Sequence, residues 1–349
     1  MIGLYHLHKQ EMDEACAEWC KAAKNLFDEF KTGRECYRYT DEQTGLTHKY
    51  HNLYDKIDGV SKIILKNFNL SIINHEIAEE MREAEILSVF SDIQEYLGYD
   101  GNRIKLVARD YRKNRERTML FYYVNEALKV PFGDLYEIMR KLMQGTVFKK
   151  LGIKTCPYCN RQYTFSLIPV KDGNPGTSPE FDHFYPKSLY PTLAASFYNL
   201  VPSCHCCNHG KRQKQLYMNP YDYGFQGGFY LKDEQGNRMN TNNILSIKYE
   251  VDIHVGYDGP FEEREDVKTL GLDQLYSMHS DYVQEIIDKV NAYNRASREG
   301  LADSFQGIFH TPEQVYGFVW GRHLELAEQE KRPLSKFTKD LLEQMGVKR

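Results

Sequence analysis

Hydrophobic residues recur at steps of three and four along residues 10–31, which predicts an amphipathic helix. Its apolar face would carry Met12, Cys16, Trp19, Cys20, Ala23, Phe27 and Phe30. Cys16 and Cys20 are therefore interpreted as small core residues, because no histidine or third cysteine stands near them. Residues 71–97, 103–125 and 132–144 predict three further helices, the last ended by Gly145. The first 145 residues are thus expected to form a helical domain.

The helical period is lost between residues 146 and 225, where Cys, Pro, Asn, His and Tyr dominate. This pattern is typical of a small unit held together by a metal ion. Residues 227–239, with a Gly-Asn turn signal, and residues 244–255, which alternate in polarity, predict two strands. We expect them to form a small β insert over residues 226–262.

From about residue 266 the helical period returns. A strong amphipathic helix is predicted over residues 272–294, starting near Asp273. Residues 311–330 predict another helix, with Thr311 as N-cap, Pro312 at the first position and Glu313 in the first turn. Residues 333–346 predict a short closing helix. The predicted fold class is α+β, with domains at 1–145, 146–225, 226–262 and 263–349.

Composition narrows the class of protein. Of 349 residues, 41% are hydrophobic and 27% are charged, which favours a globular chain over a disordered one. The net charge of −4 means that any nucleic-acid binding must come from local basic patches. No apolar run of about 18 residues predicts a membrane span, and the first residues do not resemble a signal peptide. We therefore expect a cytoplasmic protein with no membrane partner.

Five of the eight cysteines fall between positions 156 and 207. Cys156 and Cys159 form one C-x-x-C pair, and Cys204 and Cys207 form another. Two such pairs predict four thiolates around a structural Zn²⁺ that clamps the ends of the insert 160–203. Two unrelated pairs of reduced cysteines, or a redox role for the first pair, are alternatives. His205 or Cys206 in place of one ligand is a further alternative.

Polar landmarks stand inside and just after this insert: Asp182-His183, Asn199, Asn208 and Lys211. Each alone also fits a structural histidine, a turn residue or a helix cap. In this order, as "FDHFYPKS…YNLVPSC…CNHGK", residues 156–214 resemble the HNH endonucleases of the ββα-metal type. The third motif position here is Asn208 rather than His. "DHFYPKSLYP", "YNLVPSCHCCNHGK" and "PLSKFTKDLLEQMG" are similar to HNH nucleases found beside an ABC-type ATPase in Septu and retron phage-defence loci.

The resemblance implies a zinc-bound ββα-metal core and metal-dependent hydrolysis of nucleic acid, with DNA expected before RNA. It implies that His183 acts as general base and that Asp182 and Asn208 hold a catalytic Mg²⁺ or Mn²⁺. Asn199 would orient His183 or the loop between the two strands. Neighbours on a strand point to opposite faces, so we expect a bend near Asp182 and His183. An ABC-type ATPase is the implied protein partner.

Basic residues predict where nucleic acid would bind. Lys211 lies one helical turn from Asn208, Arg212 follows it in "GKRQK", and Lys187 is a weaker candidate. Arg109, Arg112 and Lys113 belong to a basic stretch that fits a phosphate-tracking surface or an ordinary solvated helix equally well.

The alternative function is a zinc-stapled binding or adaptor protein with an inactive nuclease site, partnering an ATPase. The presence of all four motif residues favours the nuclease. A redox protein is disfavoured by the second C-x-x-C pair.

Overall fold

The computed structural model describes residues 1–4, 9–33, 36–40, 47–51, 151–165, 179–247, 252–293, 307–321 and 323–347. It also describes single helical positions at 133, 136, 137, 140, 297, 300, 301 and 304. The predicted helices 71–97 and 103–125 lie outside these residues. Within the predicted helix 132–144, the four described positions are helical.

The chain divides into two compact units. The cysteine unit comprises Met1–Leu7, Ile153–Phe165 and Pro202–Arg349. The α1 unit comprises His8–Gly152 and Ser166–Val201. The predicted segments 226–262 and 263–349 both fall within the cysteine unit.

The α1 unit begins with α1 (Lys9–Gly33), which confirms the helix predicted over residues 10–31. Met12, Cys16, Trp19 and Ala23 of its apolar face are buried, and Cys20 is half-buried. The Cys16 and Cys20 sulfur atoms lie 3.7 Å apart and form no disulfide, which fits their interpretation as core residues. A separate hairpin pairs β1 (Cys36–Thr40) with β2 (Thr47–His51) in antiparallel fashion.

A second part of the α1 unit carries the Asp-His sequence. It consists of β3 (Glu180–His183), η2 (Pro191–Leu193), η3 (Phe197–Asn199) and the first two residues of β4 (Leu200–Ser203). β3 pairs with β4. α1 packs against η3, where the Trp19 Nε1–H donates to the Ala195 carbonyl at 2.7 Å. The long helix therefore supports the segment that connects the two strands.

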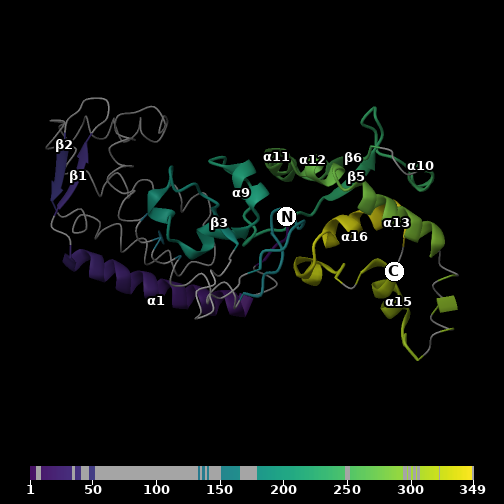
Figure 1. Ribbon diagram of the computed structural model, residues 1–349, viewed down its shortest axis with the longest axis horizontal. Helices are drawn as coiled ribbons and strands as arrows, with labels where there is room; N and C mark the ends of the chain where they lie inside the picture. Colours follow the sequence, from purple (N-terminus) through teal and green to yellow (C-terminus); the bar gives the residue numbers. More distant parts are fainter. Residues whose placement is uncertain are drawn as a thin grey trace, which may run out of the picture. The chain divides into compact units, whose positions relative to one another are not determined.

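Among the described residues, the cysteine unit holds the helices from α9 onward and the sheet of β5 and β6 (Figure 1). Its elements are α9 (His205–Lys211), β5 (Gly228–Lys232), α10 (Thr241–Leu245), β6 (His254–Asp258), α11 (Phe261–Leu270), α12 (Leu272–Ser277), α13 (Ser280–Ala292), α15 (Pro312–Trp320), η4 (Leu326–Lys331) and α16 (Ser335–Gln344). β5 and β6 are antiparallel; α16 packs on β5, and α12 packs on β6. The buried rings of Phe229, Tyr276 and Phe337 join these elements, with adjacent centroids 4.4 and 4.5 Å apart.

The strand predicted over residues 244–255 is wrong at its first four residues, and residues 248–251 lie outside the described part of the chain. Residues 241–245 form α10, because the Asn240 side chain caps the helix by accepting from the Asn243 N–H at 2.9 Å. Ile244 of this helix is buried, and strand β6 begins at His254. A buried aliphatic residue every second or third position fits both periods, which explains the error.

The helix predicted over residues 272–294 is two helices, α12 and α13. The chain turns between them at Met278 and His279, where the His279 ring accepts a hydrogen bond from the Arg161 Nε–H at 3.0 Å. α11 also starts earlier than predicted, and Gly271, with φ of 62°, separates it from α12.

The C-terminal predictions are largely confirmed. α16 occupies most of the predicted 333–346 segment. Thr311 caps α15 by accepting from the Gln314 N–H, and Pro312 stands at its first position. α15 ends at Trp320, earlier than predicted, because Gly321 adopts φ of 111°.

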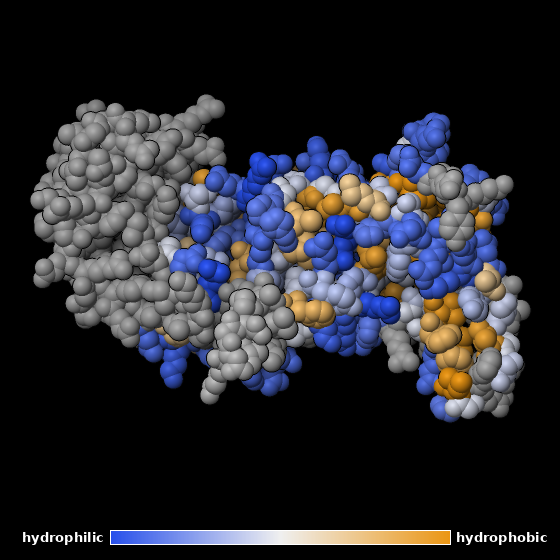
Figure 2. Space-filling view, viewed as in Figure 1, coloured by the Kyte–Doolittle hydropathy of each residue, from blue (hydrophilic) through white to orange (hydrophobic). Residues whose placement is uncertain are grey.

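Hydrophobic side chains reach the surface around α15 (Figure 2). Phe318 of this helix is 63% exposed, and Ile308 just before it is 67% exposed. Among the described helices, none combines the length and the apolar character that crossing a membrane requires.

Candidate metal centre and the Asp-His hairpin

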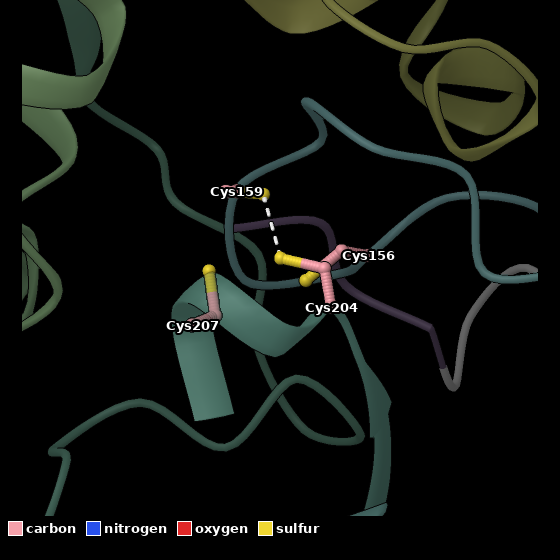
Figure 3. A group of neighbouring side chains, drawn as sticks. All are labelled: Cys156, Cys159, Cys204 and Cys207. Carbon is pink, nitrogen blue, oxygen red and sulfur yellow. Dashed lines mark hydrogen bonds between the residues drawn. The ribbon is translucent and has the colours of Figure 1, made fainter. Parts of the chain in front are cut away.

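Two short pieces of the cysteine unit bring four thiols together. Cys156 and Cys159 lie in a turn closed by the bridge between Thr155 and Tyr163. Cys204 is the residue before α9, and Cys207 lies in its first turn. The four sulfur atoms lie within 4.8 Å of one another, and all four residues are buried (Figure 3). The predicted ligand set is therefore assembled in one place.

The spacing of the sulfur atoms fits a tetrahedral metal ion. With Zn–S bonds of about 2.3 Å, neighbouring sulfurs of a tetrahedral site are roughly 3.8 Å apart. The Cys159 and Cys204 sulfurs are 3.8 Å apart, and these cysteines are free rather than disulfide-bonded. Cys206 is exposed and His205 is exposed, so neither replaces a member of the set. The four thiols form a site that can bind a metal ion such as zinc.

Thiol acidity at this site depends on burial and on neighbouring thiols. Burial raises the pKa of the Cys156 thiol well above its usual range, because a buried thiolate loses its hydration. The hydrogen bond with Cys156 lowers the pKa of Cys204. The Arg161 backbone N–H donates to the Cys159 sulfur at 3.3 Å, which favours the thiolate that a metal ion requires.

Asn160, which the sequence patterns did not single out, fixes the cysteine turn to the C-terminal part of the unit. Its Nδ2 group donates to the Thr155 hydroxyl at 3.0 Å and to the Gln329 carbonyl at 2.8 Å. Its Oδ1 atom accepts from the Lys336 N–H at 3.1 Å. The Tyr276 hydroxyl donates to the Cys159 carbonyl. The turn is therefore bonded to segments more than one hundred residues away.

In the α1 unit, Asp182 and His183 end strand β3. Asp182 is buried and His183 is half-buried. The predicted irregularity is present: the strand stops at His183 and the chain bends at residues 184–185. The Phe184 N–H then donates to the Asn199 carbonyl at 2.9 Å.

The His183 ring has a defined orientation and tautomer. Its Nε2 atom lies 2.9 Å from the Ala194 carbonyl, and a carbonyl accepts but does not donate. Nε2 therefore carries the hydrogen, and the neutral ring has an unprotonated Nδ1 that can accept a proton. The ring also packs edge-on against Tyr136, with centroids 4.6 Å apart.

Asn199 is fully buried and pins the loop that connects the strands. Its Oδ1 accepts from the Tyr185 N–H at 2.7 Å. Its Nδ2 donates to the Tyr185 carbonyl at 3.1 Å and to the Leu193 carbonyl at 2.9 Å. These bonds go to the loop and not to the His183 ring. Asn199 is thus bonded next to Ala194, which holds the ring.

The other predicted residues fall in both units of the chain. Asn208 is half-buried and lies in α9 of the cysteine unit, whereas Asp182, His183 and Asn199 belong to the α1 unit. Lys211 is fully buried, so its ammonium group is not on the surface where a nucleic-acid backbone would lie; this is a correction to its predicted role. Arg212, the residue after it, is exposed.

Lys187 is exposed, and its ammonium group lies 5.2 Å from the centre of the Tyr136 ring in a cation–π arrangement. Arg109, Arg112 and Lys113 lie outside the described residues, and their contacts with nucleic acid stay predictions.

Comparison with known proteins adds no assignment. No protein-family model matches the chain, and neither a curated protein nor a solved structure matches it.

Proposed function

We propose that the chain is a metal-dependent endonuclease of the HNH type, hydrolysing phosphodiester bonds of nucleic acid, with DNA as the first substrate to test. The observation that carries the proposal is the hairpin around His183. The ring is held by the Ala194 carbonyl, Asp182 precedes it, and Asn199 pins the loop between the strands. A held imidazole beside a carboxylate suits proton abstraction from water.

In the proposed reaction, Nδ1 of His183 takes a proton from a water molecule. The water oxygen forms a new bond to phosphorus, and the bond from phosphorus to the 3′-oxygen breaks. The leaving oxygen takes a proton from solvent. The hydrogen bond from Nε2 to Ala194 keeps Nδ1 in the accepting form and aims it in one direction.

The catalytic metal is part of the proposal. The Asp182 carboxylate and the Asn208 amide oxygen are hard oxygen donors, the donor type that Mg²⁺ and Mn²⁺ prefer. Such an ion, when bound, stabilises negative charge on the scissile phosphate and on the leaving oxygen. The neutral amide of Asn208 leaves more of the ion's charge for the phosphate than a second carboxylate would.

Cleavage assays test the proposal. The purified chain is incubated with plasmid DNA and with total RNA, in Mg²⁺, in Mn²⁺ or in EDTA. We expect metal-dependent cleavage that falls by roughly 100-fold or more in His183→Ala, because a positioned general base contributes about that much. His254→Ala is the matched control, since His254 is exposed on β6 of the other unit.

Zinc content and circular dichroism show whether each variant is folded. A folded His183→Ala variant that cleaves like the wild type would defeat the mechanism. A wild-type protein that cleaves neither substrate with either metal would contradict the proposed activity itself.

Antiviral defence beside an ABC-type ATPase is the biological setting that we propose, on the likeness of the motif sequences alone. A phage-infection assay with the wild-type locus and with His183→Ala tests it. Protection that survives the substitution would argue for the alternative, an adaptor protein that binds without cleaving.

A further inference from the structure

Two aromatic rings stand side by side on the surface of the cysteine unit. Tyr217 lies in the loop after α9, and Phe261 is the first residue of α11. They are 59% and 54% exposed, with ring centroids 6.1 Å apart and planes at 70°. Many aromatic rings of this unit are buried, among them Phe229, Tyr276 and Phe337. Together the two rings expose a small aromatic surface on which a flat ligand can stack.

The backbone that carries Tyr217 is fixed. Asp266 of α11 is buried, and its two carboxylate oxygens accept from the Tyr217 and Met218 N–H groups, both at 2.8 Å. Burial raises the pKa of Asp266 to about 6, so the carboxylate is largely ionised at pH 7.5. Leu216, just before the tyrosine, is buried. Both rings are therefore mounted on α11, which lowers the entropy lost when a ligand binds.

The loop that leads to Tyr217 is basic. Arg212 and Lys214 are exposed, and Lys214 precedes Tyr217 by three residues. Even a fully extended chain places these two Cα atoms within about 11 Å. The Lys214 N–H donates to the Lys211 carbonyl at 3.0 Å, so the chain turns as it leaves α9. Glu262, the exposed residue after Phe261, disfavours an anion next to it. Exposed cations therefore lie close to the Tyr217 ring.

We propose that Tyr217 and Phe261, with Arg212 and Lys214, form a binding surface for single-stranded nucleic acid, the rings stacking on unpaired bases and the cations contacting phosphates. Stacking accepts any base, because every base has a flat face. In a duplex these faces are covered by neighbouring base pairs, so the surface favours single strands. The inference deepens the proposed nuclease function and rests on it for the nature of the substrate.

Binding is measured separately from cleavage. The full-length His183→Ala protein, without added Mg²⁺ or Mn²⁺, is titrated at pH 7.5 into a labelled mixed-sequence DNA oligonucleotide, single-stranded or annealed to its complement. Fluorescence anisotropy gives the dissociation constants. We expect the single strand to bind more tightly than the duplex. Tyr217→Leu with Phe261→Leu should weaken single-strand binding roughly tenfold or more, since leucine keeps an apolar surface but cannot stack.

Two controls make the result specific. Tyr163→Leu with Phe165→Leu removes another exposed aromatic pair of the unit, 49% and 55% exposed, and should leave binding unchanged. Tyr217→Phe keeps a ring and should bind like the parent.

Arg212→Gln with Lys214→Gln should lower the slope of log affinity against log salt by about 1.4, which is two single-strand phosphate contacts. Zinc content and thermal unfolding confirm that each variant is folded.

The inference is overturned if the leucine pair binds single strands like its parent, or if the control pair loses as much affinity. Equal loss on single strand and duplex, or no DNA binding at all, also overturns it, and the rings would then serve a protein partner. Cleavage by the wild type is scored independently. A chain that cleaves without using these rings keeps the proposed function and loses this surface; a chain that binds through them without cleaving does the reverse.

Discussion

Asn160 and Asn199 show how single amide side chains position both candidate sites. Each is buried, and each donates and accepts hydrogen bonds with backbone groups of another segment. Asn160 adopts φ of 48°, the left-handed conformation that Asn and Asp tolerate better than most residues. An amide has both donor and acceptor atoms, so it can join a carbonyl on one side to an N–H on the other. A carboxylate of the same shape cannot.

We therefore expect Asn160→Asp to lower the free energy of unfolding by about 2–4 kcal/mol, because it places an acceptor against the Gln329 carbonyl and leaves both unpaired. Aspartate tolerates the backbone conformation, so the loss comes from the missing hydrogen bond and from the buried negative charge. Chemical denaturation of the zinc-loaded protein measures it. Asn242→Asp, at an exposed position of α10, is the control and should change stability little. An equally stable Asn160→Asp variant would show that the turn is held by the metal alone.

The four cysteines of the metal site could be predicted from the sequence, whereas the hydrogen bonds that hold the cysteine turn in place could not. The two C-x-x-C pairs carry their own spacing signal, and the four sulfurs do converge. Asn160 lies next to Cys159 but bonds to Gln329 and Lys336, which are 169 and 176 residues away. No local pattern identifies such partners. The burial of Lys211 could not be predicted for the same reason. A lysine in "GKRQK" has the local pattern of a surface residue, and only the fold shows that it is buried.

At the scale of elements, Trp19 of α1 supports the segment that connects β3 and β4. Trp19 is buried, its Nε1–H donates to the Ala195 carbonyl at 2.7 Å, and its ring lies 6.4 Å from that of Phe197. The neighbouring carbonyl, that of Ala194, holds the His183 ring. Trp19 and His183 are thus hydrogen-bonded to the carbonyls of two adjacent residues, Ala195 and Ala194. We therefore expect loss of the indole donor to shift the backbone at residues 194–195 and, with it, the His183 ring.

Trp19→Phe should lower the stability of the α1 unit by about 1–3 kcal/mol, because it leaves the Ala195 carbonyl unpaired and removes ring volume. If the proposed nuclease function holds, cleavage should also fall, but less than in His183→Ala. The chain's other tryptophan gives a matched control. Trp320 is buried, and its Nε1 has no hydrogen-bond partner among the described residues, so Trp320→Phe loses no such bond. Equal effects of the two substitutions on cleavage would contradict this coupling.

Elements with a strong period and a clear cap could be predicted, and those with competing signals could not. α1, α15 and α16 follow an apolar stripe or a Thr-Pro start. Residues 244–255 alternate in polarity as a strand does, yet the Asn240 cap places Ile244 and Leu245 in a helix. At the break between α12 and α13, His279 accepts a hydrogen bond from Arg161 of the cysteine turn, a contact that only the tertiary fold supplies.

At the scale of the whole molecule, the cysteine unit is built from three separate stretches of chain. The first stretch is bonded to the other two, with the Ile2 N–H donating to the Pro157 carbonyl and the Leu4 N–H to the Pro220 carbonyl, both at 2.7 Å. The chain leaves the unit after Phe165 and returns at Pro202. The sequence predicted that a zinc ion joins the ends of the segment between the two cysteine pairs. It did not predict that residues 166–201 of this segment belong to one unit with α1.

One cysteine pair lies before residues 166–201 and the other lies after them. A metal ion bound by both pairs would therefore join residues 153–165 to the stretch that begins at residue 202. Without the ion, only hydrogen bonds and packing would hold residues 153–165 to α9. Binding free energy at a structural zinc site is largely folding free energy. Metal loss should therefore act locally on the joined stretches before it acts on α1.

We expect the purified protein to contain one zinc ion, and Cys207→Ser to lose it and to melt at a clearly lower temperature. Amide hydrogen exchange should then rise in residues 153–165 and 202–211 and stay unchanged in α1, because α1 belongs to the other unit. Cys206→Ser is a close control, since Cys206 is exposed and adjacent but outside the sulfur cluster. A zinc-free Cys207→Ser protein with wild-type exchange in both stretches would mean that the surrounding hydrogen bonds, with Asn160 at their centre, suffice to hold the unit.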